Sequence, residues 1–126
     1  VHKGLRLIEG KVIKISNEKN KEIKIPHIGW NEIYPNNNKK EWKNKILKNV
    51  LIGKSFYFVH SFVGQTKNLN STVAICNYFN IPIPAIVSIN NIFGCQFHPE
   101  KSSVQGLQLI KNFLSILFRQ NSKKYF

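Results

Sequence analysis

Methionine and aspartate are absent from this 126-residue sequence, and only two arginines accompany its 17 lysines. Arginine makes the bidentate contacts that read bases and phosphates, so its scarcity argues against a nucleic-acid binder despite the net charge of +13. The lysines are scattered among 16 asparagines and 17 isoleucines, which indicates a drift toward A/T-rich codons. The charge still suits an acidic partner protein or a phosphorylated substrate.

The absence of methionine also bears on the start of the chain. Translation begins at methionine, whereas the first residue is Val1. We therefore expect a processed chain, an alternative-start product or a fragment. The length supports one domain or part of one. Hydrophobic residues make up 42% of the sequence, which is enough for a packed core.

Long apolar runs and a cysteine framework are missing as well. No stretch of about 18 apolar residues is present, which excludes a membrane-spanning helix. The first residues lack the basic-then-apolar order of a secretion signal. Two cysteines, Cys76 and Cys95, do not make a disulfide framework, so we expect a chain of the reducing cytoplasm.

Short β-branched and aromatic runs, most of them bounded by turn residues, predict a sheet. Residues 11–15 and 22–25 flank a polar, turn-prone stretch, 16–21, and are predicted to form a β-hairpin. The dipeptide Asn90-Asn91 predicts a second hairpin turn. The other predicted strands cover residues 55–59, 72–78, 85–89 and 92–97.

The remaining segments are interpreted as loops and helices. Residues 26–31 and 64–71 are interpreted as irregular, and residues 41–51 carry a weak helical pattern. The clearest helix covers residues 102–118, where Ser102 stands in a capping-box position. Apolar side chains recur at helical intervals and predict one stripe, which comprises Val104, Leu107, Ile110, Leu114, Leu117 and Phe118. Leu109, Phe113 and Ile116 widen this stripe, so the helix is predicted to pack deeply.

His98 and Glu100 are the residues that best fit a chemical role. They stand two positions apart at the end of a predicted strand, and Pro99 stiffens the turn between them. A carboxylate that accepts a hydrogen bond from one imidazole nitrogen fixes the tautomer, and the other nitrogen can then take a proton from a nucleophile. A surface turn with a solvated His–Glu pair explains the same spacing, so the pair alone leaves both interpretations open.

Residues 94–102 resemble the triad signature of class I glutamine amidotransferases, in which a histidine and a glutamate complete a Cys-His-Glu triad. Residues 4–10, 26–31 and 56–61 match in the same order and resemble, within that family, the glutaminase subunits of imidazole glycerol phosphate synthases. The resemblance implies an α/β fold, namely a three-layer flavodoxin-like amidotransferase domain. Residues 1–126 would form the C-terminal part of that domain and carry a β-hairpin extension.

The resemblance also implies roles for individual residues. His98 would be the general base and later the general acid, and Glu100 would orient it. The strand end at His60, Ser61 and Phe62 would contact bound glutamine, largely through backbone groups. Many relatives have tyrosine at the position of Phe62, so a side-chain hydroxyl is missing here. The positions that would face the partner, a (β/α)8-barrel synthase subunit, are Trp30, Tyr57 and Lys101.

The nucleophile of the family is a cysteine on a Gly-x-Cys-x-Gly elbow, which would lie upstream of Val1. Cys95 cannot replace it, because it precedes His98 by about 10 Å of strand and the two side chains point to opposite faces. Cys76 falls in an apolar strand, where an inert thiol is usual. We therefore expect that residues 1–126 alone have no glutaminase activity.

The complete enzyme implied by the resemblance hydrolyses glutamine to glutamate and ammonia, and the ammonia passes to the barrel subunit in histidine biosynthesis. No cofactor is implied. The histidines and cysteines lack metal-ligand spacing, so no metal site is expected. His27 is interpreted as structural, and His60 is ambiguous between holding the strand end and lining the glutamine pocket.

Three alternatives remain open from the sequence. The first is a paralogous amidotransferase subunit that supplies ammonia for the amidation of surface-polysaccharide sugars. The second is a non-catalytic remnant that binds a partner through Trp30, Tyr57 and Lys101 but releases no ammonia. The third is a basic nucleic-acid binder, whose affinity would fall steeply with salt concentration.

Overall fold

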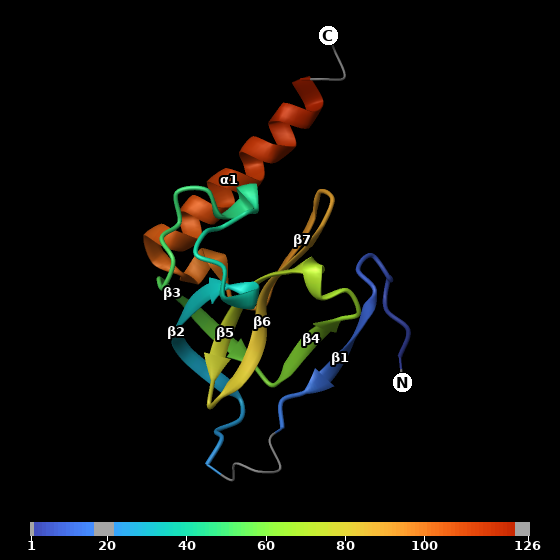
Figure 1. Ribbon diagram of the computed structural model, residues 1–126, viewed down its shortest axis with the longest axis vertical. Coiled ribbons are helices and arrows are strands. Elements are labelled where there is room, and N and C mark those ends of the chain that lie inside the picture. Colours follow the sequence, from blue (N-terminus) through green and yellow to red (C-terminus); the bar gives the residue numbers. More distant parts are fainter. Residues whose placement is uncertain (1, 17–21, 123–126) are drawn as a thin grey trace.

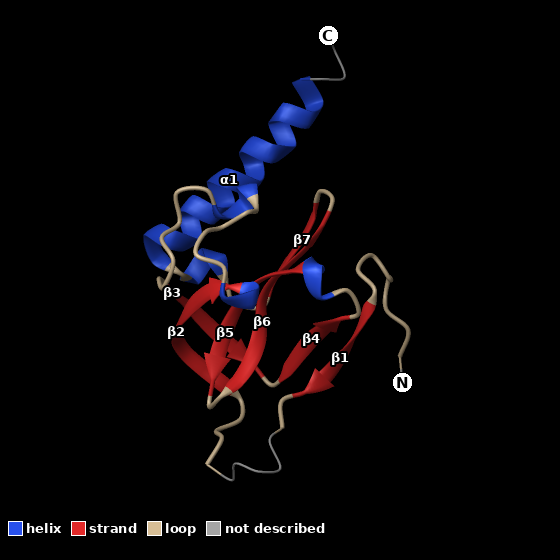
Figure 2. Ribbon diagram, in the orientation of Figure 1, coloured by secondary structure: helices blue, strands red, loops and turns tan. Residues whose placement is uncertain are grey.

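Residues 2–16 and 22–122 are described in a computed structural model, and they form two antiparallel sheets and one α-helix (Figures 1 and 2). The larger sheet has the strand order β3-β2-β5-β6-β7, and the smaller sheet pairs β1 with β4. Figure 1 shows helix α1 (Ser103–Ser122) starting beside the larger sheet and running away from it toward the C-terminus. The strands are β1 (Gly10–Lys14), β2 (His27–Pro35), β3 (Ser55–His60), β4 (Phe62–Thr66), β5 (Thr72–Tyr78), β6 (Ile81–Ile89) and β7 (Ile92–Cys95).

The hydrophobic core joins the larger sheet to the start of α1. In β3 the side chains alternate, so that Phe56 and Phe58 are fully buried while Val59 is exposed. Burying one such aromatic side chain contributes about 1.5–3 kcal/mol. Other core side chains come from six further segments and include Ile33, Leu47, Cys76, Ile83, Ile86, Phe97 and Leu109.

Several predicted elements are confirmed. The strands predicted at residues 55–59 and 72–78 correspond to β3 and β5, and Asn90 adopts a left-handed turn conformation between β6 and β7. Strand β6 begins earlier than predicted and includes two prolines, Pro82 and Pro84. Strand β7 pairs only with residues 86–89 of β6, so these prolines lie where one side of β6 has no neighbour in the sheet.

The predicted hairpin between residues 11–15 and 22–25 is not formed. Strand β1 pairs with β4 instead, in a register that places Gly10 opposite Thr66, and residues 22–25 belong to no strand. Residues 17–21, predicted as part of the connecting turn, lie outside the described residues. The error arises because a turn-prone stretch is a local signal, whereas this pairing joins segments that are distant in sequence.

Two segments interpreted as irregular also contribute to strands. Residues 27–31 begin β2, and residues 64–66 form the end of β4. The pairing of β4 with β1 requires a glycine: a β-carbon at Gly10 would lie 2.2 Å from the backbone oxygen of Gln65, so only glycine allows these two strands to come this close. Strands β2 and β4 carry no local signal, and their partners lie in other parts of the chain.

Residues 41–51 do not form the predicted helix. Only Lys45–Leu47 makes a short 3-10 turn, which the side chain of Asn44 caps by accepting a hydrogen bond from Ile46 N at 3.0 Å. Asn49 then adopts a left-handed backbone with φ of 63°, which ends any helical path. The apolar pattern in this segment therefore reflects burial of Ile46 and Leu47 rather than helical periodicity.

Helix α1 is confirmed, and Leu109 and Ile116 of the widened stripe pack on the core as predicted, but the deep packing predicted for most of the stripe is wrong. The buried side carries Gly106, Leu109 and Asn112, whereas much of the predicted stripe is exposed. The exposed fractions in that stripe are 71% for Val104, 59% for Leu107, 43% for Leu114 and 44% for Leu117. Because the apolar stripe of α1 is wider than the side that meets the sheet, its sequence does not identify which part of the stripe packs there.

Asn112 explains how α1 is attached on its buried side. Its side-chain nitrogen donates hydrogen bonds to Ile46 O at 2.8 Å and to Lys48 O at 2.7 Å. These bonds satisfy carbonyl groups of the 3-10 turn that would otherwise be buried without a partner. The helix is thus positioned by a polar contact as well as by apolar packing.

The mixture of sheets and helix fits the expected α/β class, while the three-layer arrangement is not formed by residues 2–16 and 22–122 alone. All strand pairs among these residues are antiparallel. A parallel pair needs a crossover of about a dozen residues or more, whereas short turns join β5, β6 and β7. None of the described helical residues forms a span long and apolar enough to cross a membrane.

Candidate active site

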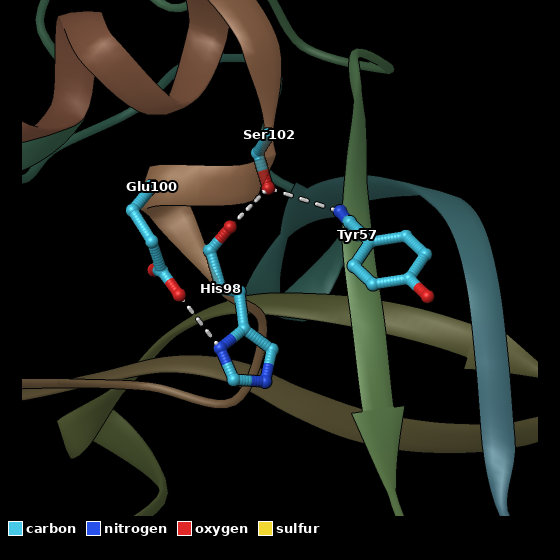
Figure 3. A network of polar contacts seen from close by, with 4 residues as sticks. All are labelled: Tyr57, His98, Glu100 and Ser102. Carbon is cyan, nitrogen blue, oxygen red and sulfur yellow. Dashed lines mark hydrogen bonds and ion pairs between the residues drawn. The ribbon is translucent and has the colours of Figure 1, made fainter.

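The segment after β7 places His98 at the surface beside β3 (Figure 3). The preceding residue, Phe97, is buried, and its ring centroid lies 4.3 Å from that of Phe56 and 5.6 Å from that of Phe58. This packing anchors the chain immediately before His98. A 3-10 turn, Pro99–Lys101, follows and brings Glu100 back toward the imidazole.

His98 and Glu100 form a hydrogen-bonded pair. The Nδ1 atom of His98 lies 2.9 Å from Oε1 of Glu100, and the side chains are 42% and 57% exposed. Since Nδ1 faces the carboxylate, Nε2 is the nitrogen left for other chemistry, and it has no hydrogen-bond partner among the described residues. The pair has the geometry required of an oriented proton acceptor that solvent or a substrate can reach.

The carboxyl group of Glu100 is held in its charged form. Its pKa is lowered from the usual value mainly by a hydrogen bond from its own backbone N–H, and further by His98 and by the charge of Lys101. Partial loss of hydration opposes this shift. An ionised carboxylate at neutral pH accepts a hydrogen bond from the Nδ1–H group of His98. This bond favours the tautomer in which Nε2 carries no proton.

Both backbone groups of His98 are tied to neighbouring elements. Its N–H donates to Tyr57 O in β3 at 2.9 Å, and its carbonyl accepts from the Ser102 hydroxyl at 2.6 Å. Helix α1 also approaches this turn closely, since a β-carbon at Gly106 would lie 1.8 Å from Pro99 O. The imidazole therefore projects from a backbone that is fixed on two sides.

The residues expected to contact a substrate lie at the junction of the two sheets. Strand β3 ends at His60 and β4 begins at Phe62, so Ser61 is the joining residue, and its carbonyl accepts a hydrogen bond from Ile15 N at 2.9 Å. The Phe62 side chain is 54% exposed. The backbone of His98 is hydrogen-bonded to Tyr57 in β3. This junction follows Tyr57 in the strand and lies about 10 Å from it along β3.

His27, interpreted from the sequence as structural, contacts His60. Its Nδ1 atom lies 2.8 Å from His60 Nε2, and its Nε2 atom lies 2.7 Å from Asn31 Oδ1. The His27 ring is fully buried between the rings of Phe58 and Tyr78, at centroid distances of 4.8 and 3.9 Å. The contact joins residues 33 positions apart, and only the β2–β3 register, which pairs His27 with His60, reveals it.

The two imidazoles form a chain of three polar contacts. The third contact joins His60 Nδ1 to the backbone oxygen of Phe62 at 2.9 Å. Rotation of the Asn31 amide by 180° would let its NH2 group donate to Nε2 of His27, and the two ring protons of neutral imidazoles then complete the other two contacts. The pair can therefore stay uncharged, as its burial favours.

Acid is expected to destabilise the protein through this pair. Burial is the main cause that lowers the pKa of His27 and of His60, and repulsion from His27 lowers that of His60 further. Below the ordinary value of about 6.5, the unfolded chain then binds more protons than the folded one, so the free energy of unfolding falls as the pH decreases. Urea denaturation at pH 7.5 and 5.5 measures this loss. Substitution His60→Gln should reduce it, and an equal loss in that variant would contradict the assignment.

A sequence profile described as glutamine amidotransferase class-I matches residues 5–117 of this chain. The chain belongs to the class I glutamine amidotransferase family. The match includes His98, Glu100 and the junction between β3 and β4.

Three relatives show how much of an amidotransferase this chain represents. It is similar to imidazole glycerol phosphate synthase subunit HisH 1 of Legionella pneumophila (strain Lens), with 42% identity over 117 residues that cover 91% of this chain and 55% of the relative. The subunit HisH of Helicobacter hepaticus is 46% identical over 116 residues, or 91% and 50% of the two chains. The subunit HisH of Pyrococcus furiosus is 40% identical over 110 residues, or 87% and 52%. The chain thus spans about half the length of the relatives it matches.

The cysteines of this amidotransferase chain are not poised to act as nucleophiles. Burial raises the pKa of the Cys76 thiol to about 12 and that of the Cys95 thiol to about 12. A reactive cysteine needs a thiolate at neutral pH, and both thiols remain protonated there.

Over the described part of the chain, no three histidine, cysteine or acidic side chains gather in a geometry that could hold a metal ion.

The three residues expected to face a partner lie near His98 in the amidotransferase fold. Trp30 and Tyr57 are opposite each other in the β2–β3 pair, and their ring centroids are 5.8 Å apart. Lys101 is exposed in the turn after Glu100, and its N–H donates to His98 O at 3.1 Å. Trp30 is 53% exposed, which is unusual for a side chain of this size and is typical of an interaction surface.

Proposed function

We propose that the complete protein containing this chain hydrolyses glutamine to glutamate and ammonia, as the glutaminase subunit of an imidazole glycerol phosphate synthase in histidine biosynthesis. The observation that carries the proposal is the His98–Glu100 pair at 2.9 Å, with Nδ1 engaged and Nε2 free. The names of the three relatives favour this pathway over the amidation of surface sugars. The family's cysteine nucleophile would come from a segment outside residues 1–126, which here form the C-terminal part of a three-layer domain.

In the first half of the proposed reaction, His98 transfers a proton twice. Its Nε2 accepts the proton of the cysteine thiol, and the thiolate attacks the side-chain carbonyl carbon of glutamine. The carbon–nitrogen bond then breaks, and the imidazolium returns its proton to the leaving nitrogen. Ammonia departs and a glutamyl thioester remains on the cysteine. Glu100 stabilises the imidazolium that forms between these transfers.

In the second half, water replaces ammonia. Nε2 of His98 accepts a proton from water as the oxygen attacks the thioester carbonyl, and the carbon–sulfur bond breaks. The proton then returns to the departing sulfur. One water is consumed, glutamate is released, and the free thiol and the neutral imidazole are restored. No cofactor enters either half.

The proposal also gives roles to the residues that join β3 to β4 and to the three residues expected to face a partner. His60, Ser61 and Phe62 would contact the glutamine, largely through backbone groups, and ammonia would pass to a (β/α)8-barrel subunit. Trp30, Tyr57 and Lys101 would face that subunit, since Lys101 and Tyr57 are hydrogen-bonded to the backbone of His98 and the Trp30 ring lies 5.8 Å from that of Tyr57.

Direct measurement of glutamate release tests the proposed function. The complete protein, purified together with its barrel subunit, is expected to release glutamate and ammonia in equal amounts from glutamine. Asparagine serves as the control substrate, because it has the same amide on a side chain that is one methylene shorter. Absence of glutamine hydrolysis from a folded complex would overturn the proposal in favour of a non-catalytic, partner-binding protein.

Substitution Trp30→Ala is expected to weaken binding of the barrel subunit at least tenfold. A large aromatic side chain at the centre of an interface commonly contributes about 2 kcal/mol or more. Isothermal titration calorimetry with the purified barrel subunit measures the change. Leu69→Ala provides the control, since Leu69 is 69% exposed but lies in the 3-10 turn Leu69–Ser71 and not in β2. Equal affinities for the wild-type protein and Trp30→Ala would place the partner on another surface.

A further inference from the structure

Ser102 is a buried residue whose hydroxyl does not make the helix-capping bond that its position predicts. Its side chain is 0% exposed. The Oγ atom donates a hydrogen bond to His98 O at 2.6 Å and accepts one from Tyr57 N at 3.0 Å (Figure 3). The hydroxyl therefore bridges the backbones of two residues that lie in different elements.

The position of β3 explains why this bridge is needed. Strand β3 lies at one end of the five-stranded order, with β2 as its neighbour in the sheet, so the backbone groups on its other side need partners. The C=O of Tyr57 accepts from His98 N at 2.9 Å, and the N–H of Tyr57 donates to Ser102 Oγ. Tyr57 is thus the anchor for both backbone groups of His98, one directly and one through Ser102.

The bridge is itself held in place by the backbone around it. Ser102 N donates to Pro99 O at 3.1 Å, and Ser102 O accepts from Gly106 N at 3.1 Å. A β-carbon at Gly106 would lie 2.9 Å from the β-carbon of Ser102 and even closer to Pro99 O, so α1 packs directly against the turn. These contacts leave the hydroxyl little room to move, so it acts as a rigid spacer between β3 and His98.

We propose that Ser102 is a positioning residue for His98, because its hydroxyl holds the His98 carbonyl against β3 and so determines where the imidazole paired with Glu100 stands. Ser102 is placed to contact the backbone and not the reacting atoms, since it is buried behind the turn. This inference rests on the proposed function, in which the placement of Nε2 limits proton transfer. A displacement of about 1 Å in such a group is enough to lower a rate about 100-fold.

Substitution Ser102→Ala in the complete protein, assayed with its barrel subunit, tests the proposal. The change removes one oxygen and adds no atoms, so it does not crowd the site. We expect kcat for glutamine to fall about 10- to 100-fold, while KM changes less than twofold, because the residue acts on proton transfer rather than on substrate binding.

Asn112→Ala provides the matched control. Asn112 is also a buried polar residue of the same helix region that bonds to two backbone groups, but these belong to Ile46 and Lys48 rather than to His98. Both variants are expected to melt at lower temperature than the wild-type protein. Only Ser102→Ala is expected to lower kcat. An equal kcat for Ser102→Ala and the wild type would overturn the proposal.

A spectroscopic measurement separates this proposal from the proposed function. The ring nitrogen resonances of His98, assigned with His98→Asn in protein labelled at histidine, are expected to move toward those of a free histidine in Ser102→Ala and to stay unchanged in Asn112→Ala. Unchanged resonances in Ser102→Ala would overturn the positioning role. Displaced resonances in a protein that hydrolyses no glutamine would support the positioning role and refute only the proposed function.

Discussion

Replacing His98 with asparagine in the complete protein is expected to lower glutamine hydrolysis at least about 1000-fold while leaving the fold intact. General acid–base catalysis contributes about 10²–10⁴-fold, and the same imidazole would serve in both halves of the reaction. The side chain is 42% exposed, so its loss should change the free energy of unfolding by no more than about 0.5 kcal/mol. Glutamate release and a thermal melt measure the two effects.

Two further variants show whether a loss of glutamine hydrolysis is specific to the His98–Glu100 pair. Glu100→Gln keeps a hydrogen-bond acceptor near Nδ1 but removes its charge, so we expect a smaller loss than for His98→Asn. His2→Asn replaces another exposed histidine, far along the chain, and should retain wild-type activity. Near-normal turnover by a correctly folded His98→Asn protein would refute the role of His98 as the proton acceptor.

The second large effect concerns residues 1–126 expressed on their own, which we expect to release no glutamate and to be poorly stable. Both cysteines of the chain are protonated at neutral pH, so no thiolate is available to attack glutamine. Much of one side of α1 is apolar and exposed, including Val104, Leu107 and Leu114. Such a surface favours association of the isolated chain.

A chimaera tests both parts of this prediction. The match covers 55% of the Legionella pneumophila relative, and the part of that relative outside the match can be joined to residues 1–126. The chimaera is expected to melt cooperatively and to gain glutaminase activity, and the same chimaera with His98→Asn is the inactive control. Glutamate release by residues 1–126 alone, or a sharp cooperative melt of their monomer, would contradict the prediction.

The elements that were predicted correctly depend on local patterns. Strand β3 follows from a dense aromatic run whose alternation buries Phe56 and Phe58, and the turn at Asn90 follows from a dipeptide that tolerates a left-handed backbone. The His98–Glu100 pair was also recognisable, because its members are two residues apart and Pro99 restricts the turn between them. In each case the interacting groups are close in the chain.

Two of the errors concern how an element that was predicted correctly packs against the rest of the fold. Residues 11–15 were assigned correctly to a strand but to the wrong partner, because the pairing with β4 depends on a close approach at Gly10. The α1 stripe predicted to pack on the sheet was also too wide, since Leu109 lies in the core while Val104 and Leu107 are exposed. Its helical periodicity is clear, yet Asn112 and Gly106 decide the orientation, one through its bonds and the other through its lack of a side chain.

The sequence by itself determined the family, the strands other than β2 and β4, the long helix and the His–Glu spacing, because these depend on residues that are near one another or on a recognisable signature. Only the tertiary structure decided that His27 contacts His60 and that Ser102 links His98 to Tyr57. Both contacts join residues more than 30 positions apart in a register that no local pattern encodes. They exist because packing of β3 against β2 and α1 leaves polar groups that must find hydrogen-bond partners away from water.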